Sequence, residues 1–144
     1  MNKIIIKNIF GGEIMTIETD GHSLAGTDMS YKNLDGADLS NMDLSNVDMR
    51  FTSLKNALFK NSRLKDADLS NTDLMNADFS DAILCGANLS NASAYGTDFS
   101  RANMKKTDMT NTYLYCASLT DTDLREAYIE EALFEYTTVE QAKL

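Results

Sequence analysis

A large apolar residue recurs at every fifth position from Leu24 to Leu144. Of the 25 positions in this series, 24 carry Leu, Ile, Met, Phe or Val, and only Ala94 departs. A second series lies two residues earlier and holds Ala, Thr, Ser or Val at 22 of its 25 positions. The residue between the two series is often Asp or Asn. Such strict self-similarity predicts a repeat architecture.

A period of five residues fits neither an α-helix nor a flat strand. Five residues advance a helix by about 500°, so the apolar positions would drift around its surface. A strand alternates its faces every two residues, so positions five apart would point to opposite sides. The pattern does fit a chain that bends once in every repeat, because the small and the large residue then share one inward face. The Asn, Asp and Gly residues that follow the large residue favour such bends.

Repeated bends close a chain into a coil, and stacked coils pair as parallel strands about 4.8 Å apart. The motif A-(D/N)-L-x-x stands out in Ala67-Asp68-Leu69-Ser70-Asn71, Ala77-Asp78-Phe79-Ser80-Asp81 and Ala87-Asn88-Leu89-Ser90-Asn91. Over residues 22 to 144 the chain therefore resembles the pentapeptide repeat proteins. The resemblance implies an all-β fold, a right-handed quadrilateral parallel β-helix with four repeats per coil. The chain would then form about six coils and a rod about 30 Å long.

Residues 1–21 lack the small and polar positions of the repeat. Two apolar segments, Lys3–Phe10 and Glu13–Glu18, flank Gly11-Gly12 and predict a β-hairpin. A hairpin here also resembles the leader that precedes many pentapeptide repeats, and it would cover the strand edges of the first coil. We therefore expect an N-terminal hairpin cap over residues 1–21 and a pentapeptide-repeat β-helix over residues 22–144.

The last ten residues leave two alternatives open, which are further coil and a cap or tail. Residues 125–135 contain good helix formers, and similar proteins often finish with a C-terminal helix. The apolar residues nevertheless stay in phase to Leu144, so we expect continued coil to about Phe134. Seven acids between Asp121 and Glu140 make this end strongly acidic.

Positions four repeats apart would stack on one face of the coil, which separates inner from outer columns. One inner column contains Phe59, Phe79 and Phe99, whose stacked rings would add about 0.5–1.5 kcal/mol per pair beyond burial. One outer face gathers large apolar and aromatic residues where other repeats carry Ser, Asp or Lys. Because Tyr is enriched in protein interfaces, this cluster is the candidate interface, with a two-fold dimer as its simplest use. Its members are Met75, Tyr95, Tyr113, Tyr115, Leu133 and Tyr136.

A second candidate surface is an acidic column on another face. It consists of Asp28, Asp48, Asp68 and Asp108, and Asn88 interrupts it. Adjacent carboxylates about 5 Å apart repel by about 3 kcal/mol at an effective dielectric of 20, and by under about 1 kcal/mol in water. A solvated column tolerates this repulsion, and a cationic partner would relieve it.

Charge and residue types narrow the function classes. The net charge of −9 disfavours direct binding to nucleic acid or to an acidic membrane surface. No phosphate-binding glycine loop, metal-ligand spacing or nucleophile motif is present, and the single histidine, His22, cannot form a metal cluster or a catalytic triad alone. Cys85 and Cys116 are expected as reduced thiols in a cytoplasmic protein. We therefore expect no catalysis and no cofactor.

The resemblance offers two functions. Most bacterial members have no known activity, so the main interpretation is a non-enzymatic interaction or scaffold protein that uses its rod surface to bind an unidentified protein partner. Some members protect DNA gyrase by imitating duplex DNA, which is the alternative. From Leu24 to Leu144 the chain carries 19 acids and 11 bases, a net charge of −8. That is one charge per roughly 4 Å, against one per about 1.7 Å in DNA, so the imitation would be weak.

Overall fold

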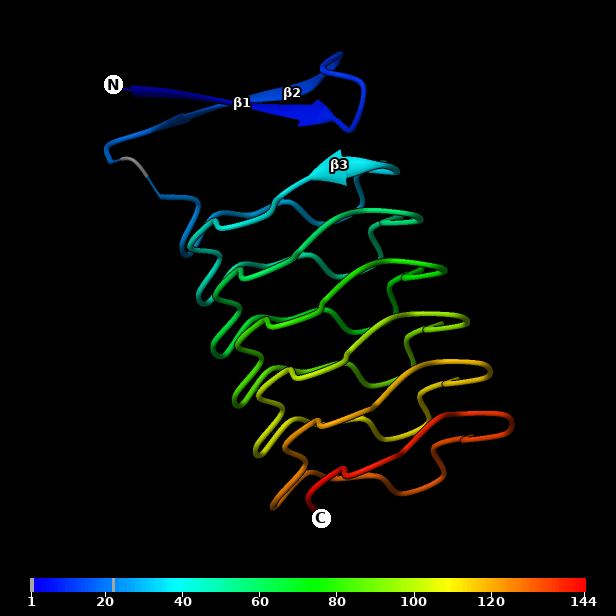
Figure 1. Cartoon of the computed structure of the whole chain (residues 1–144). Coiled ribbons are helices and arrows are strands. Elements are labelled where there is room, and N and C mark those ends of the chain that lie inside the picture. The colour runs from blue at the N-terminus through cyan, green and yellow to red at the C-terminus, as the bar shows by residue number, and fades with distance from the viewer. Residues whose placement is uncertain (1, 22) are drawn as a thin grey trace.

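The computed structural model of the chain describes residues 2–21 and 23–144, and in it the main chain winds into a rod of stacked turns (Figure 1). Isolated parallel bridges join positions four repeats apart along the whole rod, from Asp28↔Asp48 to Asp123↔Lys143. The described part contains no helix, so the predicted all-β class is confirmed. The predictions made for His22 concern a residue outside the described part.

The two apolar series of the sequence form the core of the rod. Every large residue of the series from Leu24 to Leu124 is buried, with Ala and Thr side chains beside them. Buried Thr hydroxyls bond to main-chain carbonyls. Thr52 Oγ1 donates to Met29 O of the preceding turn at 2.9 Å, whereas Thr72 Oγ1 donates to Leu69 O of its own repeat at 2.6 Å. Thr can therefore replace Ala in this column without leaving a buried donor unpaired.

Each repeat closes with a turn that contains a left-handed residue. The amide of Ala57 donates back to Leu54 O at 3.1 Å, and the intervening Asn56 has φ 56°. Asn, Asp and Gly adopt this conformation more readily than other residues. Their recurrence after the large apolar residue therefore favours the bend, although residues such as Phe51 and Arg101 adopt the same conformation at other repeats.

The predicted phenylalanine stack lies in the core. The ring centroids of Phe59 and Phe79 are 4.4 Å apart with an interplanar angle of 4°, and those of Phe79 and Phe99 are 5.2 Å apart at 19°. All three side chains are fully buried. The aromatic column is thus part of the hydrophobic core, and its rings pack three successive turns against one another.

A hairpin lies across one end of the rod, drawn in blue in Figure 1. It consists of β1 (Asn2–Asn8) and β2 (Glu13–Thr19), which pair antiparallel. The other edge of β1 pairs with β3 (Ala37–Asp38), so the sheet order is β2-β1-β3. Ile6 of β1 is fully buried against the first turn, whereas Ile5, its neighbour, points outward.

Residues 125–144 form the last turn of the rod, at the end where the chain stops in Figure 1. The backbone pairs Asp108↔Tyr128 and Asp123↔Lys143 place this segment in the coil rather than in a helix. Its inward-phase residues are not covered: Ile129 is 43%, Val139 53% and Leu144 88% exposed.

Candidate interaction surfaces

One face of the rod carries a tyrosine strip, which is the name used here for Met75, Tyr95, Tyr113, Tyr115, Leu133 and Tyr136. Its residues follow one another along the rod. Asn76 N donates to Tyr95 O and Gly96 N to Tyr115 O, each at 2.9 Å, while Tyr113 pairs with Leu133 in the adjacent column. Tyr113 and Tyr95 are about half exposed, and Tyr115 is partly buried.

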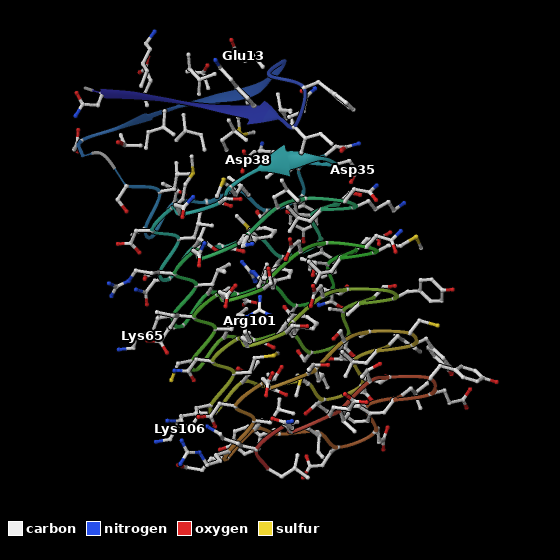
Figure 2. The ribbon with its side chains drawn as sticks, in the orientation of Figure 1. Glu13, Asp35, Asp38, Lys65, Arg101 and Lys106 are labelled. Carbon is white, nitrogen blue, oxygen red and sulfur yellow. The ribbon has the colours of Figure 1, made fainter. Side chains whose placement is uncertain are left out.

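The tyrosine strip is poor in charge. Its first turn holds Asp73, which is paired with Lys55 Nζ at 3.1 Å, and its last turn holds Glu135. In the two middle turns of the strip, the outward positions of this face carry no charged side chain. These positions hold Ser93, Tyr95, Gly96, Tyr113, Tyr115 and Cys116. By contrast, Lys65 and Lys106 are exposed at other corners of the rod, where each lies near a carboxylate (Figure 2).

Tyr95 lies near Cys116 of the next turn. The Cys116 side chain raises the pKa of the Tyr95 phenol, which is neutral at physiological pH even at its ordinary pKa. Cys116 is exposed, and its thiol, like that of Cys85, is free. The strip therefore presents a neutral phenol at its centre.

The acidic column is in register, with pairs Asp28↔Asp48 and Asp48↔Asp68 and with Asn88 between Asp68 and Asp108. Each carboxylate, however, is engaged by its own repeat. The Oδ1 atom of Asp68 accepts the Ser70 amide at 3.0 Å, and the same contact recurs at the other three aspartates. These contacts are Asx-type turns, in which the side chain supports the bend that follows it.

Hydrogen bonds and one guanidinium stabilise the ionised form of this column. The Ser30 hydroxyl and amide lower the pKa of Asp28, and the Arg50 side chain lowers that of Asp48. Arg50 binds Asp48 with two nitrogens, at 3.0 and 2.7 Å, and its Nε lies 3.9 Å from Asp68. The column is therefore partly neutralised on the protein itself. The D-x-S spacing of Asp28 and Asp68 is the sequence signal for these contacts, which the prediction of an outward acidic column did not include.

Two further features of the surface were not predicted from the sequence. Tyr31 and Phe51 stack on the surface with ring centroids 5.0 Å apart, at left-handed positions with φ 57° and 58°. Their spacing of four repeats in an outer column was the available signal. The second feature is a recess in the last turn, lined by Leu119, Leu124, Ile129, Phe134, Val139, Ala142 and Leu144.

Exposed charged residues belong to the same turn as this last-turn recess. They are the glutamates Glu126, Glu130, Glu131, Glu135 and Glu140 and the bases Arg125 and Lys143. The sequence had indicated an acidic end, but not that apolar side chains of this turn would be exposed. The last turn therefore combines an apolar recess with outward side chains that are mostly acidic.

Metal and membrane features can be assessed for the described residues. In residues 2–21 and 23–144, no group of three or more His, Cys, Asp or Glu side chains is placed to hold a metal ion. The same residues include no helix long and apolar enough to cross a membrane.

Comparison with known proteins identifies the family. The family described as pentapeptide repeats matches in eight copies, over residues 23–61, 43–81, 52–91, 72–111 and 95–130. The chain belongs to the pentapeptide repeat family, as its A-(D/N)-L-x-x motifs predicted. A search of curated proteins finds no significant match.

Several solved structures are similar to the chain. HetL, a pentapeptide repeat protein involved in heterocyst differentiation regulation in the cyanobacterium Nostoc, is 21% identical with a TM-score of 0.45, and the match covers 83% of this chain and 75% of HetL. A pentapeptide repeat protein of the Arabidopsis thaliana thylakoid lumen is 34% identical over 72% of this chain and 65% of its own, with a TM-score of 0.39. QnrB1, a plasmid-mediated fluoroquinolone resistance protein, is 20% identical over 76% of this chain and 68% of its own, with a TM-score of 0.44.

Proposed function

We propose that this protein is a non-enzymatic interaction module that works through its rod surface and self-associates through the tyrosine strip. The observation that carries this proposal is a contiguous set of exposed tyrosines on a face almost free of charge. Large aromatic groups at the centre of a patch, with few charges among them, are typical of binding hot spots.

We take a second copy of the chain as the partner that binds the strip, and the reason is electrostatic. Two copies that each carry a net charge of −9 repel each other over most of their surfaces. The strip is a face on which two rods can meet without bringing rows of carboxylates together. A two-fold axis through this face would place the same residues on both sides of the contact.

The oligomeric mass in solution tests this proposal. The double variant Tyr115→Asp, Leu133→Asp places two charges on the strip, and we expect it to sediment as a monomer under conditions where the wild type sediments as a dimer. Ile83→Asp is the matched control, because Ile83 is an outward apolar residue, 40% exposed, on a different face. A wild-type monomer, or a dimer that survives the double substitution, would show that the strip is not the dimer interface.

The proposal includes an architecture and a location. We take the coil to be right-handed, as parallel strands joined by crossovers almost always are, with about six turns over residues 22–144 and residues 1–21 as their cap. A cytoplasmic location is supported by the thiols of Cys85 and Cys116, which remain free, one of them exposed.

The alternative function, protection of DNA gyrase by imitation of DNA, has weaker support. Asn88 interrupts the acidic column, and Arg50 neutralises part of it. A supercoiling assay with purified gyrase and a quinolone separates the two functions. Inhibition of supercoiling, or protection from the drug, at micromolar protein would favour the DNA-mimic function over the interaction module proposed here.

A further inference from the structure

The side of the rod that lies two repeats away from the tyrosine strip, and therefore opposite it, has a different composition. In three successive turns, its outward positions hold a basic pair, an apolar pair and a polar–basic pair. These are Arg63 and Lys65, Ile83 and Cys85, and Asn103 and Lys105. The bridges Arg63↔Ile83 and Ile83↔Asn103 stack the three turns in register. We refer to these six residues as the basic face.

Every charged residue of the basic face is a cation, although the chain has a net charge of −9. Arg63 takes part in no salt bridge among residues 2–21 and 23–144. Lys65 only approaches Asp66, at 3.8 Å, and both side chains are at least half exposed. The basic face is therefore a local positive patch on an acidic molecule.

The corners on either side of these three turns do not cancel this charge. They carry Asp66, Asp81, Arg101 and Lys106, two acids and two bases. Arg101 Nε lies 2.7 Å from Asp81 Oδ1, so that acid is already neutralised. In Figure 2, the side chains of Lys65 and Lys106 project from the same edge of the rod. The positive charge of the basic face is therefore available to a partner.

An apolar turn separates the two basic turns, and aspartates limit the patch along the rod. Ile83 is 40% exposed at the centre. Asp43 lies at the equivalent position of the preceding turn and Asp123 at that of the following turn. Lys105 Nζ lies 3.4 Å from Asp123 Oδ2, but Arg125 binds the same oxygen more closely, at 2.8 Å. Lys105 is therefore only partly neutralised, and the patch is three turns long.

The spacing of the turns selects the shape of the ligand. Successive turns are about 4.8 Å apart, which separates the main chains of Lys65 and Lys105 by about 10 Å, with Ile83 about halfway between them. An α-helix rises about 5.4 Å per turn, and its residues i, i+4 and i+7 share one face. Alternate residues of an extended strand are about 6.7 Å apart, so they do not match the turns.

We propose that the basic face binds an acidic amphipathic helix of a partner protein, which lies along the rod axis. Two carboxylates seven residues apart on the helix pair with Lys65 and Lys105, and an apolar side chain between them covers Ile83. Arg63, on the same turn as Lys65, contacts the first carboxylate. This site goes beyond the self-association proposed for the tyrosine strip and does not depend on it.

The charges favour a short helix over a nucleic acid, because a nucleic acid carries phosphates without interruption. Beyond the three turns it would meet Asp43 and Asp123. A second copy of the chain is also disfavoured. It would have to offer its acidic column, in which Asp68 Oδ1 accepts the Ser70 amide and Asp48 is paired with Arg50.

A fluorescein-labelled helical peptide of about 21 residues is the probe, and fluorescence anisotropy is the measurement. One face of the peptide carries Glu at positions i and i+7 and Leu at i+4, with Ala and Gln elsewhere. We expect binding that weakens as salt is raised to about 0.3 M. A peptide of the same composition with these residues scattered around the helix, and one with Ser in place of Leu, should each bind about fivefold more weakly.

Protein variants locate the binding. Arg63→Gln, Lys65→Gln should weaken binding of the peptide about fivefold, since each exposed charge pair contributes modestly. Lys7→Gln, Lys32→Gln removes the same charge outside the basic face and is the matched control, with an expected change below about twofold. All four residues are exposed, so folding should be preserved, which thermal unfolding checks.

Two further variants separate this site from the tyrosine strip. Ile83→Asp places a carboxylate at the centre of the basic face, and it should weaken the peptide at least about tenfold while leaving the sedimenting mass unchanged. Tyr115→Asp, Leu133→Asp should have the reverse effects. Either proposal can therefore fail while the other stands.

Several outcomes would overturn the proposal. No binding at about 1 mM protein would exclude the site. Equal binding of the scattered peptide, or equal losses in the two Gln pairs, would reveal only a general attraction between opposite charges. Tighter binding of a single-stranded oligothymidylate of the same charge would indicate a nucleic acid. A change in the sedimenting mass of the Arg63→Gln, Lys65→Gln variant without peptide would identify a second copy as the occupant.

Discussion

The two ends of the rod differ in what lies over their stacked apolar residues. At the hairpin end, β1 pairs with β3 and buries Ile6 completely, and Leu24 below it is 1% exposed. At the last turn, Leu124 is still buried, but Val139 and Leu144 lie in the open. The same five-residue pattern runs through both turns, so the difference in burial comes from what lies over each turn and not from the repeat itself. Covering an end requires sequence of a different kind, which residues 2–19 provide.

The largest effect should separate the middle of the rod from the last turn. Phe79→Ala removes a fully buried ring stacked on both sides, and we expect it to lower the free energy of unfolding by about 3–5 kcal/mol. Phe134→Ala removes a partly exposed ring and should cost less than about 2 kcal/mol. Urea denaturation monitored by circular dichroism measures both. Equal losses would mean that the last turn is as well packed as the core.

A smaller difference should distinguish the two ends directly. Ile6→Ala opens a cavity beneath the hairpin and should cost about 2–4 kcal/mol. Val139→Ala trims a side chain that is 53% exposed and should cost under about 1 kcal/mol. The same urea titrations apply. A small loss for Ile6→Ala would contradict the view that the hairpin is packed firmly on the first turn.

A third comparison uses bulky residues at left-handed positions near each end. Tyr136 has φ 58° and is 85% exposed, so Tyr136→Asn should stabilise the monomer by about 0.5 kcal/mol by relieving backbone strain, measured at a protein concentration too low for dimers. Tyr31→Asn relieves the same strain but loses the stack on Phe51, which contributes about 0.5–1.5 kcal/mol. Its net effect should be close to zero or destabilising. Thermal melts would contradict this account if Tyr31→Asn were the more stabilising of the two.

The smallest expected effect is on the loss of folding stability at low pH. Arg125 lowers the pKa of Asp123, and Arg50 lowers that of Asp48, so both carboxylates hold protons less tightly in the folded state than in the unfolded state. Their contribution to stability is therefore complete above about pH 4 and is lost as the pH falls below it. Asp123 also lies 3.4 Å from Lys105 and its side chain is 17% exposed, against 28% for Asp48.

Between about pH 5 and pH 2.5 the free energy of unfolding should therefore fall less in the Asp123→Asn variant than in the Asp48→Asn variant. Urea midpoints at each pH measure this fall. The control is Asp20→Asn, because that residue lies between the hairpin and the first turn and belongs to neither ion pair. Steeper loss of stability in the Asp123→Asn variant would reverse the sign of the argument.

Most of the fold was predictable because the repeat is a local pattern with a global consequence. The period of five places Phe59, Phe79 and Phe99 in one column, and the rings do stack. The spacing of four repeats also aligned Asp28 with Asp48 and Tyr113 with Leu133, as the bridges show.

The parts that were not predicted depend on atoms that the pattern does not distinguish. An outward Asp has the same place in the repeat whether its carboxylate faces water or accepts the amide two residues later, so the role of Asp68 in its turn was overlooked. The exposure of Ile129 depends on whether another turn lies above it, and no feature of its own repeat reveals that.

The interval of four repeats between paired positions has a consequence for how such a surface can change. Removing a single five-residue unit upstream of Tyr95 would leave the bend and the inward side chains of every remaining repeat in phase. It would also carry all later side chains round to the adjoining side of the rod. The tyrosines would then line up beneath different neighbours from those that precede them now. In a molecule built this way, the direction in which a surface points is set by counting repeats, and one small deletion can redirect it without altering a single contact residue.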